Sequence, residues 1–260
     1  MRIALGVEYA GDAFCGWQSQ PGGCGVQDAL ERALGTIAAQ PIGTVAAGRT
    51  DAGVHASSQI VHFDTDANRP ANAWVRGVNA LLPHAAAVLW AQQVENGFHA
   101  RFAASARHYT YLLLARAERP GLFTRRVGWY HASLDIDAMR EGAKHLAGTH
   151  DFSAFRAAEC QAKSPIKTVT RIDMAAQGSL IRFDFSADAF LHHMLRNMIG
   201  SLVYVGAGKH PPEWIAELLH ARDRTAAAPT FAPDGLYLTG ADYPARFALP
   251  GTCRDVGVQL

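Results

Sequence analysis

The sequence predicts an α+β protein whose sheets are mixed or antiparallel and carry helices on one face. Segments that alternate apolar and polar residues outnumber the segments with helical spacing. Several of the predicted strands also follow one another with no helix between them, which argues against a doubly wound parallel sheet. With 49% hydrophobic and 18% charged residues, the 260-residue chain can bury one large core or two smaller ones.

The elements of the first half follow from their periodicities. Residues 2–9 place Ile3, Leu5, Val7 and Tyr9 on one face, which predicts a half-buried strand. Residues 25–39 carry apolar side chains at helical spacing and predict an amphipathic helix. Further along the chain we predict strands at 43–47, 59–63 and 88–94 and a helix from Trp74 to Leu82, ended by Pro83.

The second half repeats this plan loosely. A strand is predicted at 107–114, and residues 167–174 and 179–185 are typical of a hairpin that turns at Gln177 and Gly178. Helices are predicted from Ile136 to Leu146, from Phe190 to Val205 and from Pro212 to His220, and a closing strand at 236–239. The similar order of elements in the two halves hints at a duplication.

Membrane and secreted proteins are excluded by the hydropathy pattern. No stretch approaches the roughly 18 unbroken apolar residues that a membrane helix requires. An acid, Glu8, also lies where the apolar region of a signal peptide belongs. We therefore expect a soluble cytoplasmic protein.

The four cysteines, Cys15, Cys24, Cys160 and Cys253, are scattered without a Cys-x-x-Cys pair. This spacing makes a disulfide framework or a structural zinc site improbable. We expect reduced, inert thiols.

Charge is unevenly distributed although the net charge is only +1. Residues 99–131 contain six arginines against a single acid, Glu118, and also hold three histidines and three tyrosines. Arginines interleaved with aromatic side chains are typical of an RNA-binding surface, where cations meet phosphates and flat rings stack on bases. A solvated basic face is the alternative interpretation.

The polar loop from Ala47 to His55 lies between two predicted strands and has glycines on both sides of Asp51. Arg49 in the same loop favours the ionised form of that carboxylate, because a nearby cation stabilises its charge. An ionised, positioned carboxylate acts as a nucleophile, as a base or as half of a structural ion pair. The composition of the loop does not choose among these roles.

The loop sequence Gly48–His55 resembles the signature of the tRNA pseudouridine synthase A family. Further blocks similar to those of the family follow in the family's order along nearly the whole chain, at residues 16–18, 25–27, 99–102, 107–111, 148–152, 190–197, 223–225 and 235–238. The chain departs from the family pattern at Ala10, where an acid is usual, and at Phe231, where a small residue is expected. Neither departure falls on the residues that the family uses for chemistry.

The resemblance assigns roles to individual residues. Asp51 is the expected nucleophile, and Arg49 would contact the backbone of the extruded nucleotide or hold the space that it leaves. Tyr109 would stack on the target uracil, and Arg196 would hold Asp51 by an ion pair. Further tRNA contacts are expected from Arg69, from His99, Ala100, Arg101 and Phe102, and from residues 159–163.

The resemblance also implies an architecture and a substrate. We expect two similar α+β halves, residues 1–103 with the catalytic Asp loop and residues 104–260 completing the cleft, with joined sheets and an active cleft between them. The expected activity is isomerisation of uridine to pseudouridine at the thirty-eighth to fortieth nucleotides of tRNA, in the anticodon stem-loop, by a homodimer. No cofactor and no metal are expected.

This reaction breaks the C1′–N1 bond of uridine, turns the uracil and rejoins it through C5, so it needs no redox partner. The carboxylate of Asp51 attacks C1′, attacks C6 or helps to remove a C2′ proton, and the sequence leaves these three routes open. A base within a stem must first be extruded, at a cost of a few kcal/mol.

Two other functions compete with the isomerase. A non-catalytic RNA-binding protein would use the same basic residues. A metal-dependent hydrolase would use Asp51 and His55 as ligands, but the sequence supplies no third ligand nearby and Gly53 disfavours the helix that would align the two. His192 and His193 receive no ligand role, because neighbouring positions point to different faces of the predicted helix.

Overall fold

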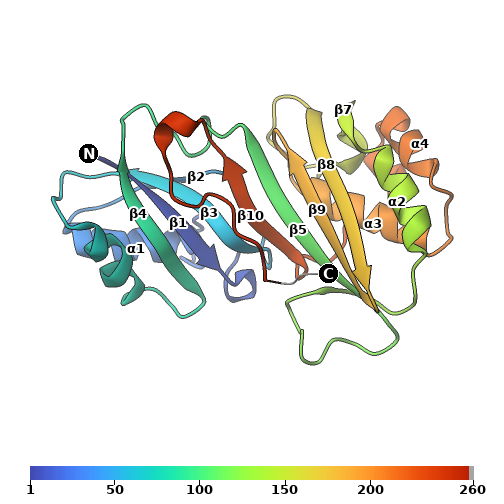
Figure 1. Cartoon of the computed structure of the whole chain (residues 1–260), viewed down its shortest axis with the longest axis horizontal. Helices are drawn as coiled ribbons and strands as arrows, with labels where there is room; N and C mark the ends of the chain where they lie inside the picture. The colour runs from blue at the N-terminus through green and yellow to red at the C-terminus, as the bar shows by residue number, and fades with distance from the viewer. Residues whose placement is uncertain (258–260) are drawn as a thin grey trace. The chain divides into compact units, whose positions relative to one another are not determined.

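The computed structural model describes residues 1–257, and these residues form two units (Figure 1). Unit 1 consists of Met1–His108 together with the described residues from Tyr237 onward, and unit 2 consists of Tyr109–Leu236. The described residues include ten strands of a mixed sheet, which confirms the predicted α+β class.

The strands of unit 1 are arranged around β1 (Arg2–Tyr9). It pairs antiparallel with β3 (His55–Asp64) on one side and with β4 (Ala86–Val94) on the other. The short strand β2 (Thr44–Ala46) pairs antiparallel with β3, and β10 (Leu236–Asp242) pairs parallel with it. This mixture of directions matches the predicted mixed sheet.

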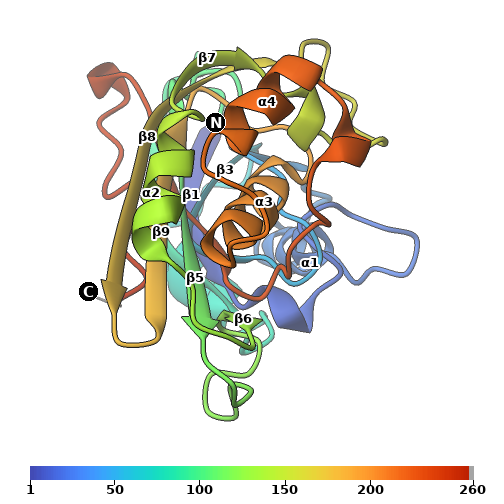
Figure 2. The ribbon, with the colours of Figure 1, turned by 90° about the vertical axis from the view of Figure 1, so that its right-hand side faces the viewer.

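Helix α1 (Val26–Ala38) buries Val26, Leu30 and Leu34 on its apolar stripe and lies on one side of β1 and β3 (Figure 2). The helical segment around Ala73–Gly77 winds as a π-helix and buries Trp74, whose ring meets that of Phe63 at 5.2 Å. Both helices appear where the sequence predicts them.

Unit 2 contains the strand order β5 (Ala106–Ala115), β9 (Leu180–Ala187), β8 (Ile166–Gln177) and β7 (Gly148–Asp151), with β6 (Gly128–Tyr130) paired parallel to β5. The first three residues of β5 belong to unit 1. Strands β8 and β9 form the predicted antiparallel hairpin. Gly178 occupies the turn with a φ of +59°, a conformation that glycine adopts without strain.

Three helices complete unit 2: α2 (Ile136–Lys144), α3 (Met194–Gly206) and α4 (Trp214–Ala221). Figure 2 shows α3 and α4 on one side of β8 and β9, in keeping with the predicted helical layer. Helix α3 is buried along most of its length. Single 3-10 turns occur at Gly11–Ala13, Ser153–Phe155, Arg224–Ala226 and Ala245–Phe247.

The largest differences between the predicted elements and the structure concern the starts of β3 and α3 and two short strands that are not predicted. Strand β3 begins at His55, the last residue of the polar loop, rather than at residue 59. Helix α3 begins at Met194 rather than at Phe190, because His193 takes a left-handed conformation with a φ of +60°. Strands β6 and β7 are not predicted, because they are too short to show an alternation of apolar and polar residues.

The unit boundary also differs from the expected division at residues 103 and 104. The described residues from Tyr237 onward cluster with unit 1 because β10 pairs with β3, through Tyr237 with His55 and Leu238 with Ala56. The tail that follows is held there too, since Ser57 Oγ donates to the carbonyl of Arg254. A pairing between residues so distant in sequence leaves no local signature.

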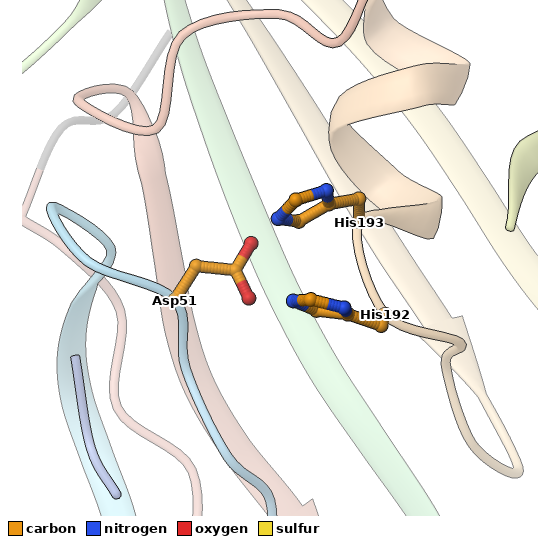
Figure 3. Close-up of side chains that lie close together, drawn as sticks. All are labelled: Asp51, His192 and His193. Atoms are coloured by element: carbon orange, nitrogen blue, oxygen red, sulfur yellow. The ribbon is translucent and has the colours of Figure 1, made fainter. Parts of the chain in front are cut away.

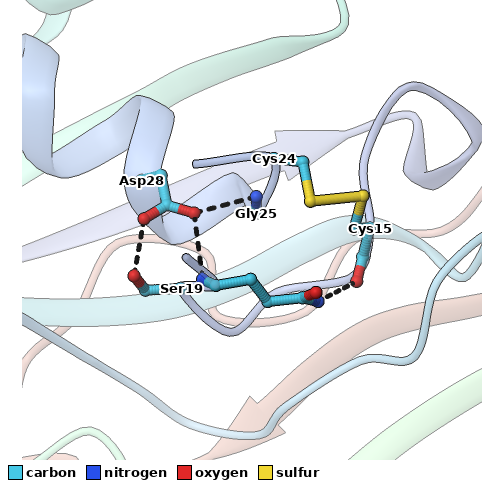
Figure 4. Close-up of a disulfide and its surroundings, with 6 residues drawn as sticks. Cys15, Ser19, Cys24, Gly25 and Asp28 are labelled. Carbon is cyan, nitrogen blue, oxygen red and sulfur yellow. Dashed lines mark hydrogen bonds between the residues drawn. A yellow bond between two sulfur atoms is a disulfide. The ribbon is translucent and has the colours of Figure 1, made fainter. Parts of the chain in front are cut away.

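Cys15 and Cys24 form a disulfide, which corrects the expectation of reduced thiols for these two cysteines, whereas Cys160 and Cys253 are free thiols (Figure 4). Their Cα atoms are 5.4 Å apart, because the backbone N–H of Cys15 donates to the carbonyl of Cys24 at 3.0 Å. The bridge closes the loop that leads into α1. Next to it, Asp28 accepts hydrogen bonds from the N–H of Gly25 at 2.9 Å and from Ser19 Oγ at 2.6 Å, and so caps the helix.

Within residues 1–257, no helix is both long enough and apolar enough to cross a lipid bilayer.

Candidate active site

The polar loop between β2 and β3 folds as a tight turn that presents Asp51. The N–H of Val54 donates to the carbonyl of Asp51 at 3.1 Å, and Gly53 has a φ of +83°. This is the geometry of a type II turn, whose third position favours glycine. The turn therefore accounts for the glycine at position 53 without any ligand.

Thr50 holds the loop to the body of unit 1. Its carbonyl accepts the N–H of Trp17 at 3.0 Å, and its buried hydroxyl lies 2.7 Å from that of Tyr9. The Gln59 amide donates to the carbonyl of Gly48 at 2.6 Å on the other side of the loop. Burial raises the pKa of the Tyr9 phenol, so this hydroxyl stays neutral. The residue before Asp51 is thus fixed by both its backbone and its side chain.

Gly16 allows the close approach of the segment that donates to Thr50. It has a φ of +96°, and a Cβ atom there would lie 2.9 Å from the Thr50 carbonyl oxygen and 3.1 Å from the Asp51 carbonyl carbon. Trp17 beside it is 2% exposed and packs on Tyr9 with a ring-centroid distance of 5.9 Å, so its role is structural. The segment 16–18 therefore supports the Asp51 loop.

His55 is a buried structural residue at the start of β3. Its Nδ1 accepts the N–H of Gly11 at 3.0 Å, and its ring stacks on Tyr237 at 4.7 Å. The backbone of Val54 also lies against Gly11, where a Cβ atom would meet the Val54 carbonyl oxygen at 2.0 Å. These contacts account for a histidine at the end of the loop, so no metal-ligand role is needed to explain His55.

The two charged residues of the loop differ in exposure. Asp51 is half-buried, whereas Arg49 is exposed, as the predicted contact with a nucleotide backbone requires. Figure 3 shows the carboxylate of Asp51 extending from this loop, and it also shows His192 and His193 on the segment that leads into α3.

His192 and His193 precede α3, which corrects the expectation that they lie within the helix and point to different faces of it. Their ring centroids are only 4.0 Å apart. The N–H of His192 donates to the Sγ of Cys160 at 3.4 Å, which ties this segment to the loop that contains residues 159–163.

Tyr109 and Arg196 belong to unit 2. Tyr109 lies on β5, is 8% exposed, and meets the ring of Phe190 edge-on at 5.2 Å. Arg196 lies in the first turn of α3, and its Nε donates to the carbonyl of Phe231 at 2.8 Å. The N–H of Phe231 in turn donates a hydrogen bond to the carbonyl of Arg196 at 3.2 Å. Phe231, where the resemblance leads us to expect a small residue, thus contacts Arg196 through its backbone.

The segment from His99 to Phe102 forms an exposed aromatic and cationic cluster on unit 1. The rings of His99 and Phe102 stack at 4.3 Å, the guanidinium of Arg101 lies 5.5 Å from the Phe102 centroid, and Phe102 is 75% exposed. Ala100 differs from its neighbours because it is fully buried. Its N–H donates to His62 Nδ1 at 3.1 Å and its carbonyl accepts from the Tyr243 hydroxyl at 2.6 Å. Ala100 therefore anchors the cluster.

The other expected tRNA contacts lie on the surface of their units. Arg69 is exposed in unit 1, with its Nε donating to the carbonyl of Ile37 at 3.0 Å. Glu159 and Lys163 are exposed on a loop of unit 2. Arg156 holds this loop by donating to the carbonyls of Cys160 at 2.6 Å and Ala162 at 3.0 Å.

Sequence reasoning missed the residues that hold these groups in place. Tyr9, Gln59 and His62 lie in apolar strands, where a polar side chain must find a hydrogen-bond partner. That signal points to a buried polar contact but does not reveal its partner. Tyr111, placed by sequence on the strand of Tyr109, is likewise buried, and its hydroxyl donates to the carbonyl of Ala232 at 2.8 Å.

Known proteins resemble this chain over nearly its whole length. A family model described as tRNA pseudouridine synthase matches residues 6–103 and 143–244. The tRNA pseudouridine synthase A of Chromobacterium violaceum is 60% identical over 261 residues, which cover 100% of this chain and 100% of that protein. That of Dechloromonas aromatica is 58% identical over 255 residues, covering 98% and 97%. That of Thiobacillus denitrificans is 60% identical over 250 residues, covering 96% of each.

The family model covers the turn with Asp51 and the segment that begins α3, whereas Tyr109 lies between its two matched ranges. The full-length relatives extend this match from end to end. This chain belongs to the tRNA pseudouridine synthase family.

Proposed function

We propose that this protein isomerises uridine to pseudouridine in the anticodon stem-loop of tRNA, at the thirty-eighth to fortieth nucleotides, with Asp51 as the nucleophile. The observation that carries the role of Asp51 is its position in a turn whose preceding residue, Thr50, is held by the N–H of Trp17 and the hydroxyl of Tyr9. A backbone fixed in this way loses little conformational freedom when a substrate arrives.

The proposed reaction starts with extrusion of the target uridine from its stem. The C1′–N1 bond then breaks, the uracil turns, and a bond forms between C1′ and C5, so the product has the same atoms as the substrate. As the nucleophile, Asp51 bonds to C1′ or C6, and that bond breaks again before the product leaves. In the alternative route Asp51 acts as a base that assists removal of the C2′ proton and returns the proton at the end. Arg49, exposed on the same loop, would contact the phosphate backbone that the extruded nucleotide distorts.

Tyr109 is proposed to supply a flat face for the target uracil. The edge-on contact with Phe190 fixes the plane of its ring, which lowers the entropy cost of stacking. Stacking of a base on an aromatic side chain contributes on the order of 1–3 kcal/mol. Arg196, whose Nε is held by the carbonyl of Phe231, is proposed to form the ion pair with Asp51.

The cluster from His99 to Phe102 and Arg69 are proposed to bind tRNA outside the reacting nucleotide. Stacked His99 and Phe102 present aromatic surface, and Arg101 supplies the cation next to it. Burial and the nearby charge of Arg2 lower the pKa of His99, so this ring contributes as a neutral aromatic near pH 7. We further propose that the protein acts in the cytoplasm as a homodimer.

The proposal is tested by mapping pseudouridine in tRNA incubated with the protein. Carbodiimide treatment followed by reverse transcription should give stops at the thirty-eighth to fortieth nucleotides with the wild-type chain and none with Asp51→Asn. Asp137→Asn provides the control, because the Asp137 side chain is 90% exposed on α2. Stops elsewhere would overturn the proposed site on tRNA, and undiminished stops with Asp51→Asn would overturn the role of Asp51.

A further inference from the structure

We propose that His108, Asp242 and Cys253 of unit 1 bind a zinc ion. One ligand atom from each of the three side chains lies within 4.8 Å of the other two. His108 Nε2 is 3.0 Å from Asp242 Oδ1, and Cys253 Sγ is 3.7 Å from the same oxygen. Ligand atoms around a tetrahedral zinc ion are separated by about 3.5 Å, so small side-chain movements suffice.

The three donors form a set that zinc prefers over harder cations. Imidazole nitrogen, carboxylate oxygen and thiolate sulfur all bind zinc in proteins, whereas magnesium and calcium select oxygen ligands. Asp242 is 53% exposed and His108 is 24% exposed at their side chains, so solvent reaches the cluster. Water can therefore supply the fourth ligand.

The backbone brings Cys253 to this place. Residue 253 forms an isolated antiparallel bridge with Gly240 of β10, and the N–H of Arg254 donates to the carbonyl of Thr239 at 2.8 Å. A Cβ atom on Gly240 would lie 2.4 Å from the Thr252 carbonyl oxygen and 2.7 Å from Cys253 Sγ, so any larger residue there would displace the tail together with its thiol. The glycine leaves the space in which the sulfur lies beside Asp242.

A metal bound here would join three separate segments of unit 1. His108 is on β5, Asp242 ends β10, and Cys253 lies on the tail that follows. The tail otherwise depends on hydrogen bonds such as that from Ser58 Oγ to the carbonyl of Thr252 at 3.0 Å. The proposed role is structural and independent of the chemistry of Asp51.

The test is a cobalt titration of the full-length chain, prepared without an affinity tag and first dialysed against a chelator. Co²⁺ bound through Cys253 should produce a thiolate-to-cobalt charge-transfer band that saturates at one equivalent and disappears when Zn²⁺ is added. The band should be lost in Cys253→Ser and reduced in Asp242→Asn. It should persist in Cys160→Ser, which removes the other free cysteine of the described residues.

Thermal melting gives a second measurement that does not depend on the spectrum. Zn²⁺ should raise the melting temperature of the wild-type chain, because a ligand that binds only the folded state stabilises it. It should leave that of Cys253→Ser unchanged. Absence of the cobalt band in the wild-type chain, or a band of full intensity in Cys253→Ser, would overturn the proposal.

Discussion

Thr50, the residue before the proposed nucleophile, holds the Asp51 loop in place. Thr50 is 7% exposed and accepts the N–H of Trp17 while its hydroxyl meets that of Tyr9. Asp51 and Arg49 on either side of it are at least partly accessible to solvent. The loop thus alternates an anchored residue with residues that can reach a substrate.

Tyr9→Phe should lower both stability and activity, because it removes one partner of a buried hydroxyl pair. The Thr50 hydroxyl then loses the Tyr9 oxygen, which costs about 1–2 kcal/mol in the free energy of unfolding. A urea denaturation curve measures this loss, and the turnover number should fall because Asp51 follows Thr50 directly. Tyr204→Phe on α3 serves as the matched control. Equal effects of the two variants would argue against the special role of the Tyr9 hydroxyl.

Gly16→Ala should destabilise the protein, whereas Gly22→Ala should not. At Gly16 an alanine would adopt a φ of +96° and place its Cβ 2.9 Å from the Thr50 carbonyl oxygen. Strain of this kind costs on the order of 1–3 kcal/mol. No atom lies within 4 Å of a Cβ built on Gly22. Urea denaturation of both variants checks the difference, and a fully stable Gly16→Ala protein would contradict the close packing against the loop.

At the scale of the element, the disulfide and the helix that follows it act together. Cys15 and Cys24 close the loop that includes Gly16 and Trp17, and residues 26 and 27 then donate from the start of α1 to the carbonyls of Gly16 and Trp17. The first turn of α1 and the disulfide therefore hold the same segment that donates to Thr50.

Reduction of the disulfide should lower the free energy of unfolding by about 2–3 kcal/mol, because the open loop gains conformational freedom in the unfolded chain. Unfolding in urea with and without dithiothreitol measures the change. The double variant Cys15→Ser, Cys24→Ser should match the reduced wild-type chain and respond no further to dithiothreitol. An equal free energy of unfolding of the wild-type chain with and without dithiothreitol would contradict this account.

At the scale of the whole molecule, one buried histidine gives stability a pH dependence. Burial, together with Arg2 and His99, lowers the pKa of His62 to about 4, against about 6.5 in an unfolded chain. Between these values the unfolded state binds more protons than the folded state. The stabilisation is therefore complete above about pH 6.5 and is lost as the pH falls toward 4.

His62→Asn should flatten this pH dependence, since an amide does not titrate and its oxygen can still accept the N–H of Ala100. Melting temperatures between pH 7 and pH 4.5 should fall less steeply for the variant than for the wild-type chain. Parallel curves would show that other groups cause the acid sensitivity.

The sequence predicts most local structure here but little of the long-range pairing. The period of residues 2–9 predicts β1, and the helical spacing around Leu30 predicts α1, because each reflects one buried face. The pairing of β10 with β3 and the disulfide join residues without any local pattern. The same holds for the cluster of His108, Asp242 and Cys253, whose members are isolated in sequence.

The candidate site likewise contains residues that the sequence predicts and residues that only the folded structure identifies. Asp51 and Arg49 are found from the motif, because the turn and its charges are contiguous. The hydrogen bonds that fix the turn come from Tyr9 and Trp17, more than thirty residues away from it in the sequence. Only the folded chain identifies these partners.

The central claim is that Asp51 performs the chemistry and that tRNA binding is separable from it. The most direct measurement compares tRNA affinity and single-turnover pseudouridine formation for the wild-type chain, Asp51→Asn and Asp137→Asn. We predict that Asp51→Asn binds tRNA within a few-fold of the wild-type affinity yet forms no detectable pseudouridine, while Asp137→Asn keeps both properties. Pseudouridine formation by Asp51→Asn at the wild-type rate would contradict the account.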